Sequence, residues 1–138
     1  MKCVAVTPES TVVDQEVKFV VAPLFDGEFG VAEGHSPAIG RLGAGELRMT
    51  LNDGSVESWY VEGGFVEISN NVVSLLTNRA IAIDSLEPEA ARKDLEKALA
   101  LAADTPEAQK ARSEAVRVAR AVLRVAEKAA ERAKSGRV

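Results

Sequence analysis

The stretch ELRMTLNDGSVESWYV, residues 46–61, decides which fold this sequence predicts. Two runs with β-branched and aromatic residues flank Asn52-Asp53-Gly54, and an Asp-Gly pair accepts the positive φ angles of a tight turn. The stretch therefore predicts a β-hairpin. Similar short runs surround it, namely KCVAV, EVKFVVAPL and GFVEISNNVVSLLTNRAIAI, with Ser69-Asn70-Asn71 as a further turn. Many short strands at close spacing are typical of a small β-sandwich or flattened barrel.

The composition of the chain changes near residue 84. Nine of the ten glycines lie in residues 1–84, whereas alanine accounts for 15 of the 54 residues that follow. The charge changes at the same place, because residues 1–84 carry −7 and residues 85–138 carry +3. We therefore expect an α+β chain with a β-sandwich domain over residues 1–84 and a helical domain over residues 85–138, each with its own partners. A charge of +3 spread among nine acidic residues is too weak to indicate nucleic acid as a partner.

Residues 85–138 predict two helices joined by a short turn. Ser85 is a candidate N-cap for the first helix, and Asp104 or Thr105, followed by Pro106, is a candidate start for the second. The short connection indicates an antiparallel helical hairpin. On one face of the second helix, small apolar residues recur at helical spacing: Ala111, Ala115, Val118, Val122, Val125 and Ala129. Because alanine buries little area, two interpretations stay open, a movable element or an ordinary amphipathic helix with a solvated basic face.

The length and the cysteine content limit the class of protein. The chain has 138 residues, of which 46% are apolar and 28% charged, as in soluble globular proteins. No apolar run approaches the roughly 18 residues that a membrane-spanning helix needs. The first residues, MKCVAVTPES, have no secretory or transit character, so we expect the protein in the compartment where it is made. Cys3 is the only cysteine, which excludes an internal disulfide and a cysteine zinc cluster.

Residues 26–37, DGEFGVAEGHSP, are the candidate functional segment because they hold the only histidine, three glycines and three acidic residues. One histidine excludes a two-histidine metal site. A catalytic triad through His35 and Ser36 is disfavoured, because adjacent side chains point apart and no G-x-S-x-G sequence is present. The glycines match no phosphate-binding motif, and Glu28 and Glu33 would repel a phosphate. The segment therefore predicts a contact surface.

Three segments, VTPE, DGEFGVAEGHSPAIGRLGAGELR and VEGGFVEISNNVVSLLTNRA, resemble the epsilon subunit of F-type ATP synthases, in order, through most of residues 4–84. The resemblance implies a ten-stranded β-sandwich followed by two helices. It also implies a non-catalytic rotor subunit of the central stalk that docks beside the gamma subunit and rests on the ring of c subunits. Such a protein would lie at the cytoplasmic face of the inner membrane and would touch the membrane only through the complex.

The resemblance also implies roles for particular residues. The GEFG segment, taken as a turn, corresponds to the contact with the c-ring, so Glu28 is the expected contact, flanked by Phe29, Gly30 and Val31. His35 corresponds to a histidine at the interface with gamma. The helical hairpin of the family inhibits ATP hydrolysis when it extends toward the alpha and beta catalytic subunits, where basic residues meet an acidic segment of beta. The matching candidates by helical face are Arg117, Arg120, Arg124 and Lys128.

One motif of the family is degenerate here. Some members bind ATP on the hairpin through I/L-D-x-x-R-A, but this chain has Glu87 in place of the aspartate and Ala90 in place of the arginine. Arg92 lies two residues later, on another side of the helix, and cannot simply substitute. We therefore expect no cofactor and weak or no ATP binding. Two alternatives remain, a nucleotide-sensing module whose hairpin closes on ATP, and a small enzyme that uses His35.

Overall fold

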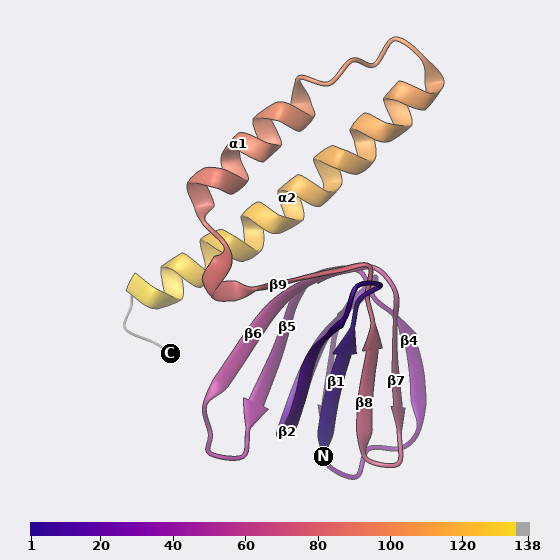
Figure 1. Ribbon diagram of the computed structural model, residues 1–138, viewed down its shortest axis with the longest axis vertical. Coiled ribbons are helices and arrows are strands. Elements are labelled where there is room, and N and C mark those ends of the chain that lie inside the picture. The colour runs from indigo at the N-terminus through magenta and orange to yellow at the C-terminus, as the bar shows by residue number, and fades with distance from the viewer. Residues whose placement is uncertain (135–138) are drawn as a thin grey trace. The chain divides into compact units, whose positions relative to one another are not determined.

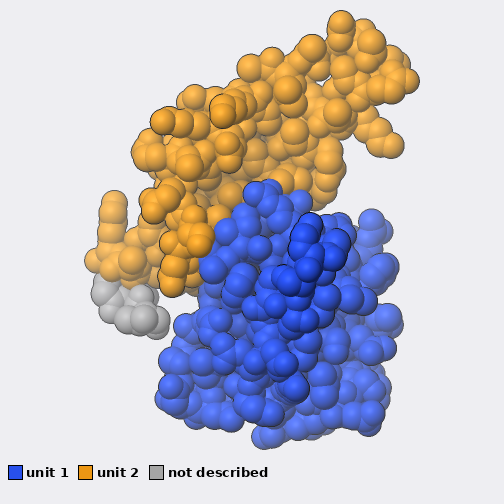
Figure 2. All heavy atoms as spheres, viewed as in Figure 1, with its two compact units in different colours: residues 1–82 blue, residues 83–138 orange. Residues whose placement is uncertain are grey.

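The computed structural model describes residues 1–134 of the chain. Contacts within the chain define two compact units, one over Met1–Ala82 and one that begins at Ile83 (Figure 2). The first unit is the β-sandwich that the sequence predicts, and the second contains two helices (Figure 1). The described residues form nine strands, one fewer than the ten that the resemblance implies.

The strands of the first unit follow one another through short turns. They are β1 (Lys2–Val6), β2 (Thr11–Leu24), β3 (Gly27–Ala32), β4 (Ala38–Arg41), β5 (Ala44–Leu51), β6 (Val56–Glu62), β7 (Phe65–Ser69), β8 (Val72–Leu76) and β9 (Arg79–Ala82).

The long strand β2 belongs to both layers of the sandwich. Its first half pairs with β1, and its second half pairs with β3 on one side and β5 on the other. The first sheet therefore has the order β4-β7-β8-β1-β2, and the second has the order β3-β2-β5-β6-β9 (Figure 1). All of these pairs are antiparallel except β1 with β8. Where β2 passes from one sheet to the other, the amide of Val17 donates to the carbonyl of Met1.

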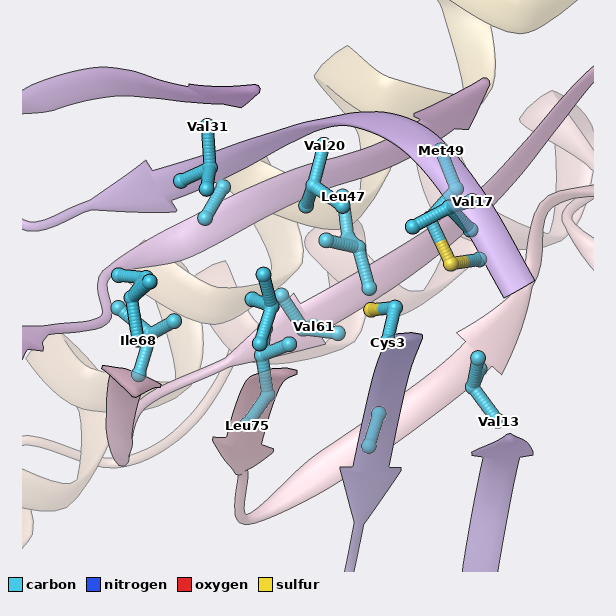
Figure 3. Packing of buried hydrophobic residues seen from close by; sticks show 14 of the residues in the cluster. Cys3, Val13, Val17, Val20, Val31, Leu47, Met49, Val61, Ile68 and Leu75 are labelled. Carbon is cyan, nitrogen blue, oxygen red and sulfur yellow. The ribbon is translucent and has the colours of Figure 1, made fainter. Parts of the chain in front are cut away.

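The core lies between the two sheets and is built from alternate residues of each strand. Figure 3 shows side chains from both sheets pointing toward one another, among them Val20, Val31, Leu47 and Leu75. Because successive side chains of a strand face opposite sides of the sheet, the residues between these face outward. Cys3 is part of this core, and its burial raises the pKa of the thiol to about 12, so the thiol is unreactive.

Two predicted turns are present and need special backbone conformations. Gly54 has a φ of 89° in the turn between β5 and β6. Asn70 and Asn71 have φ values of 52° and 63° and form the two-residue turn between β7 and β8. Asparagine tolerates this left-handed region better than most residues, which is why the sequence could signal the turn without glycine.

The helices of the second unit are α1 (Pro88–Leu99) and α2 (Pro106–Lys134). The hydroxyl of Thr105 accepts a hydrogen bond from the amide of Ala108 at 3.0 Å, so Thr105 is the N-cap of α2, as predicted. The predicted N-cap of the first helix, Ser85, is wrong. Ser85 ends a short 3-10 helix (Ile83–Ser85), and Glu87 occupies the N-cap position because Pro88 begins the α-helix.

The contact between the two helices consists mainly of alanine and valine, with one leucine. Leu95 and Ala98 of α1 pack against Ala115, Val116 and Ala119 of α2. The predicted stripe is confirmed at Val122 and Val125, which are buried, and wrong at Ala111, which is exposed; Val116 and Ala119 are buried although the stripe did not include them.

Two arginines link the helices at opposite ends of α1. Arg92 ion-pairs with Glu127 at 3.4 Å, and Arg112 donates to the carbonyl oxygen of Leu99 at 3.2 Å. These contacts make the hairpin antiparallel, as the short connection predicted.

Candidate interaction surfaces

The segment that the sequence singles out, residues 26–37, begins as the second strand of a β-hairpin. The resemblance treats GEFG as a turn, but the turn is Phe25-Asp26, and Gly27 already pairs with Leu24. The segment continues as β3 along the edge of the second sheet, where, among the strands of residues 1–134, it pairs with β2 alone. This corrects the sequence interpretation, because side chains of a strand alternate between two faces and cannot all meet one partner.

This alternation narrows the predicted contact with the c-ring. Glu28 and Gly30 lie on the outer face, and both are exposed. Val31 points into the core and is fully buried, so its side chain offers no contact surface (Figure 3). Phe29 is half-buried and packs against the same core. Of the four predicted residues, Glu28 and Gly30 are therefore the accessible pair.

Glu28 does not stand alone on the outer face of the second sheet. Its carboxylate accepts a hydrogen bond from the Arg48 guanidinium at 3.2 Å. The same nitrogen of Arg48 lies 3.5 Å from the carboxylate of Glu46. One cation on β5 therefore bridges two carboxylates, one on its own strand and one on β3. Sequence reasoning missed Arg48, although it forms part of the quoted segment GAGELR.

His35 lies beyond the end of β3 in a structural role. Its Nδ1 donates to the carbonyl oxygen of Ser36 at 2.6 Å, and its ring packs edge-on against Phe29 with centroids 5.4 Å apart. Next to it, hydrogen bonds from the α-amino group of Met1 lower the pKa of Glu33. His35 therefore has a backbone carbonyl and an aromatic ring as neighbours, which is not the arrangement of a general base and its nucleophile.

A second exposed surface lies on the outer face of the first sheet, and sequence reasoning missed it. Phe65 of β7 pairs directly with Leu76 of β8. Ile39 of β4 pairs with Glu67, two residues after Phe65, and therefore lies diagonally across from Phe65 on the same face. The three side chains are 55%, 62% and 73% exposed, respectively, and we call them the apolar patch. Neighbouring residues Val66 and Leu75 are buried, so these strands are apolar on both faces. Consecutive apolar residues in the runs GFV and SLL were the available signal.

The apolar patch has a cationic border. Arg41 pairs with Phe65 in the register of β4 and β7. Its guanidinium lies over the ring of Phe25, 5.7 Å from the centroid, in a cation–π contact. Phe25 is itself 69% exposed. Exposed apolar side chains that gather in this way on a folded domain indicate a protein contact rather than random surface variation.

The predicted basic residues of α2 are all exposed. Arg117 forms an ion pair with Glu114 one turn earlier, and its hydrogen bonds lower the pKa of that carboxyl. Arg120, Arg124 and Lys128 follow at intervals of four residues, and within residues 1–134 they form no ion pair. A spacing of four places them along one face of the helix.

The described residues contain neither a membrane span nor a metal site. No helix within residues 1–134 is both long and apolar enough to cross a membrane. In the same part of the chain, no three His, Cys, Asp or Glu side chains gather in a way that could hold a metal ion.

Comparison with known proteins agrees with the resemblance. The family model described as ATP synthase, Delta/Epsilon chain, beta-sandwich domain matches residues 1–83. The chain is 47% identical over 124 residues to the ATP synthase epsilon chain of Rhodopirellula baltica, covering 90% of this chain and 96% of that one. It is 40% identical over 118 residues to the epsilon chain of Desulfitobacterium hafniense, covering 86% and 83%.

Two solved structures show the same fold. One is a chain in a structure of the Euglena gracilis mitochondrial ATP synthase that is described as OSCP, F1 and c-ring. The match has a TM-score of 0.77 at 22% identity and covers 93% of this chain and 79% of that one. A chain in the central stalk and c-ring of the Tetrahymena thermophila mitochondrial enzyme matches 89% with a TM-score of 0.63 at 15% identity, over 96% of its length.

Proposed function

The chain belongs to the family of ATP synthase epsilon chains, non-catalytic subunits of that complex, and from this premise we propose that it couples the catalytic subunits to the c-ring as part of the central stalk. In this proposal the sandwich docks on the gamma subunit and rests on the ring, and the helical hairpin limits ATP hydrolysis. The protein then lies peripherally at the cytoplasmic face of the membrane and contacts the membrane only through the complex.

The apolar patch is the observation that carries this proposal. Ile39, Phe65 and Leu76 form one exposed apolar surface on a sheet whose other face is already packed into the core. Three large apolar side chains would gain from burial against a partner. We assign this surface to gamma. His35, which the resemblance assigns to the same interface, is half-buried and lies outside the patch.

Capture of purified gamma by the purified full chain tests the docking proposal. The expected result is a stable complex of one copy each, without nucleotide. The alternative that the chain is a small enzyme using His35 predicts turnover by the isolated chain that is lost in His35→Ala. If the chain fails to retain gamma and shows such turnover, the docking proposal is wrong and the chain is an enzyme that uses His35.

The basic residues of α2 support the inhibitory part of the proposal. Arg120, Arg124 and Lys128 present three cations along one exposed face, with Arg117 at the start of the row. An acidic segment of the beta subunit is the partner whose charge complements this face. Apart from Leu95, the contact between α1 and α2 consists of alanine and valine side chains, so limited apolar area opposes a change in the position of the helices.

Neutralising this face should raise ATP hydrolysis. We expect the double variant Arg120→Gln and Arg124→Gln, in the reconstituted complex, to hydrolyse ATP about three- to tenfold faster, with assembly and synthesis largely unchanged. Lys93→Gln with Lys97→Gln makes the same change of charge on α1 and should leave hydrolysis unaltered. If both double variants hydrolyse ATP at the wild-type rate, the inhibitory role of this face is wrong. Removal of residues 85–138 then shows whether the hairpin inhibits hydrolysis at all.

For nucleotide binding by the hairpin we propose weak or no affinity. The position of the family's arginine is Ala90, and Arg92 is already paired with Glu89 at 2.6 Å and with Glu127 at 3.4 Å. A phosphate at Arg92 would have to compete with both carboxylates for the guanidinium. Calorimetric titration of the full chain with ATP should therefore give no submillimolar dissociation constant. Submillimolar binding, abolished by Arg92→Gln, would favour the nucleotide-sensing alternative.

A further inference from the structure

We propose that Arg48 is a positioning residue for Glu28, and that the partner loop offers Glu28 neutral N–H donors rather than a lysine or arginine. This inference rests on the proposed contact between Glu28 and the c-ring. It adds to that contact a residue on another strand and a chemical class for the opposing group.

The register of three neighbouring strands brings the two side chains together. Val21 of β2 pairs with Arg48 on one side and with Gly30 on the other, so these three residues form one row across the sheet. Glu28 lies two residues before Gly30 and therefore on the same face. Arg48 reaches diagonally across β2 to bond Glu28 at 3.2 Å.

Glu46 is a second carboxylate partner of the same guanidinium nitrogen. It lies two residues before Arg48 on β5, on the same face, and its carboxylate is 3.5 Å from the same nitrogen. An arginine between two carboxylates has less freedom to turn than one with a single partner. Arg48 is one-third exposed and Glu28 is 60% exposed, so the fixed part of the pair is the arginine and the accessible part is the glutamate.

The consequence for binding is preorganisation. A solvent-exposed glutamate that is free to rotate loses side-chain entropy when a partner holds it. Arg48, which Glu28 shares with Glu46, already restricts Glu28 and leaves its second carboxylate oxygen to accept a hydrogen bond. An exposed ion pair with a partner cation would add little and would bring that cation close to Arg48, whereas backbone or side-chain amides can bond the remaining lone pairs without repulsion from Arg48.

The experiment measures the affinity of the full chain for the gamma–c-ring complex from which the native subunit has been removed. We expect Glu28→Gln and Arg48→Gln each to weaken binding about three- to tenfold, and the double variant to be no weaker than Glu28→Gln alone. Arg48→Lys should recover part of the loss, since it restores the charge but not the planar guanidinium that bonds both carboxylates. Arg79→Gln removes an arginine from β9 that pairs with Glu62 and should leave the affinity unchanged.

The salt dependence tests the chemical class of the opposing group. The ratio of affinities between wild type and Glu28→Gln should stay within about twofold when KCl rises from about 50 mM to about 500 mM, because a bond to a neutral donor is screened little. A ratio that falls toward one at high salt overturns the neutral-donor part, because it indicates a cation opposite Glu28.

The other outcomes separate this inference from the proposed function. If Glu28→Gln binds as tightly as wild type, the assignment of Glu28 to the ring contact is wrong. If Glu28→Gln weakens binding but Arg48→Gln does not, or if their effects simply add, the contact stands and the positioning role of Arg48 is wrong. Thermal unfolding of each variant identifies a loss of affinity caused by misfolding, and Arg48→Lys then remains as the decisive variant.

Discussion

Replacing Gly64 with alanine is expected to destabilise the β-sandwich by at least about 3 kcal/mol. Gly64 has a φ of 95°, a region that residues with a side chain rarely adopt. A Cβ at this position would lie 1.7 Å from the carbonyl oxygen of Leu76 and 2.9 Å from the Cα of Thr77. Both are backbone atoms, one at the end of β8 and one in the residue after it, so no rotamer change can relieve the overlap. Urea unfolding followed by the fluorescence of Trp59, the single tryptophan, measures the loss.

Gly54→Ala is the matched control for this prediction. Gly54 has a similar φ of 89°, but a Cβ there would meet no atom within 4 Å. Alanine at this site therefore carries only the cost of the left-handed conformation, about 1 kcal/mol. Equal losses in the two variants would contradict the overlap at Gly64 as the cause. A stable Gly64→Ala variant would mean that the connection between β8 and β9 can move away from β7.

Local signals in the sequence predicted much of the fold. Asn52-Asp53-Gly54 and Asn70-Asn71 are turns whose residues accept positive φ angles, and both turns are where the sequence placed them. Thr105 followed by Pro106 likewise begins a helix. Each of these features is determined by a few neighbouring residues, so it can be predicted from the sequence without knowledge of the tertiary structure.

Pairing between distant strands could not be predicted from the same signals. The GEFG segment resembles a turn because it is rich in glycine, but pairing with β2 makes it a strand and sends Val31 into the core. Ser85 was a plausible cap by composition, yet Pro88 sets where the helix begins. The bond between Arg48 and Glu28 joins residues that are 20 positions apart, and it follows only from the order β3-β2-β5.

The apolar patch was missed for a related reason. A strand with apolar residues on both faces is expected where a sheet is covered on both sides. The run VVSLL of β8 was therefore consistent with an interior strand, although Leu76 is 62% exposed. The sequence shows that a residue is apolar, but only the strand register shows which apolar side chains lie on the outer face of the sheet. Here those residues are the ones that a partner would cover.

Phe65→Asp is expected to weaken binding of the full chain to gamma about 30- to 1,000-fold, a loss of about 2–4 kcal/mol. Phe65 occupies the middle of the apolar patch, between Leu76 on β8 and Arg41 on β4. Removing the ring loses its buried area in the complex, and the new carboxylate would lose its water there. Because Phe65 is 55% exposed in the free chain, the same change should alter the stability of the sandwich little. Titration calorimetry with purified gamma measures the affinity.

Val56→Asp is the control that separates this surface from exposed apolar side chains in general. Val56 is 47% exposed, close to the value for Phe65, but it begins β6 beside the turn at Gly54, on the other sheet. It should bind gamma as tightly as wild type, whereas Leu76→Asp should resemble Phe65→Asp. If Phe65→Asp and Leu76→Asp both keep wild-type affinity while their unfolding transitions stay cooperative, gamma docks elsewhere on the sandwich. A loss of equal size in all three variants would instead mean that added negative charge repels gamma regardless of its position, since residues 1–84 already carry −7.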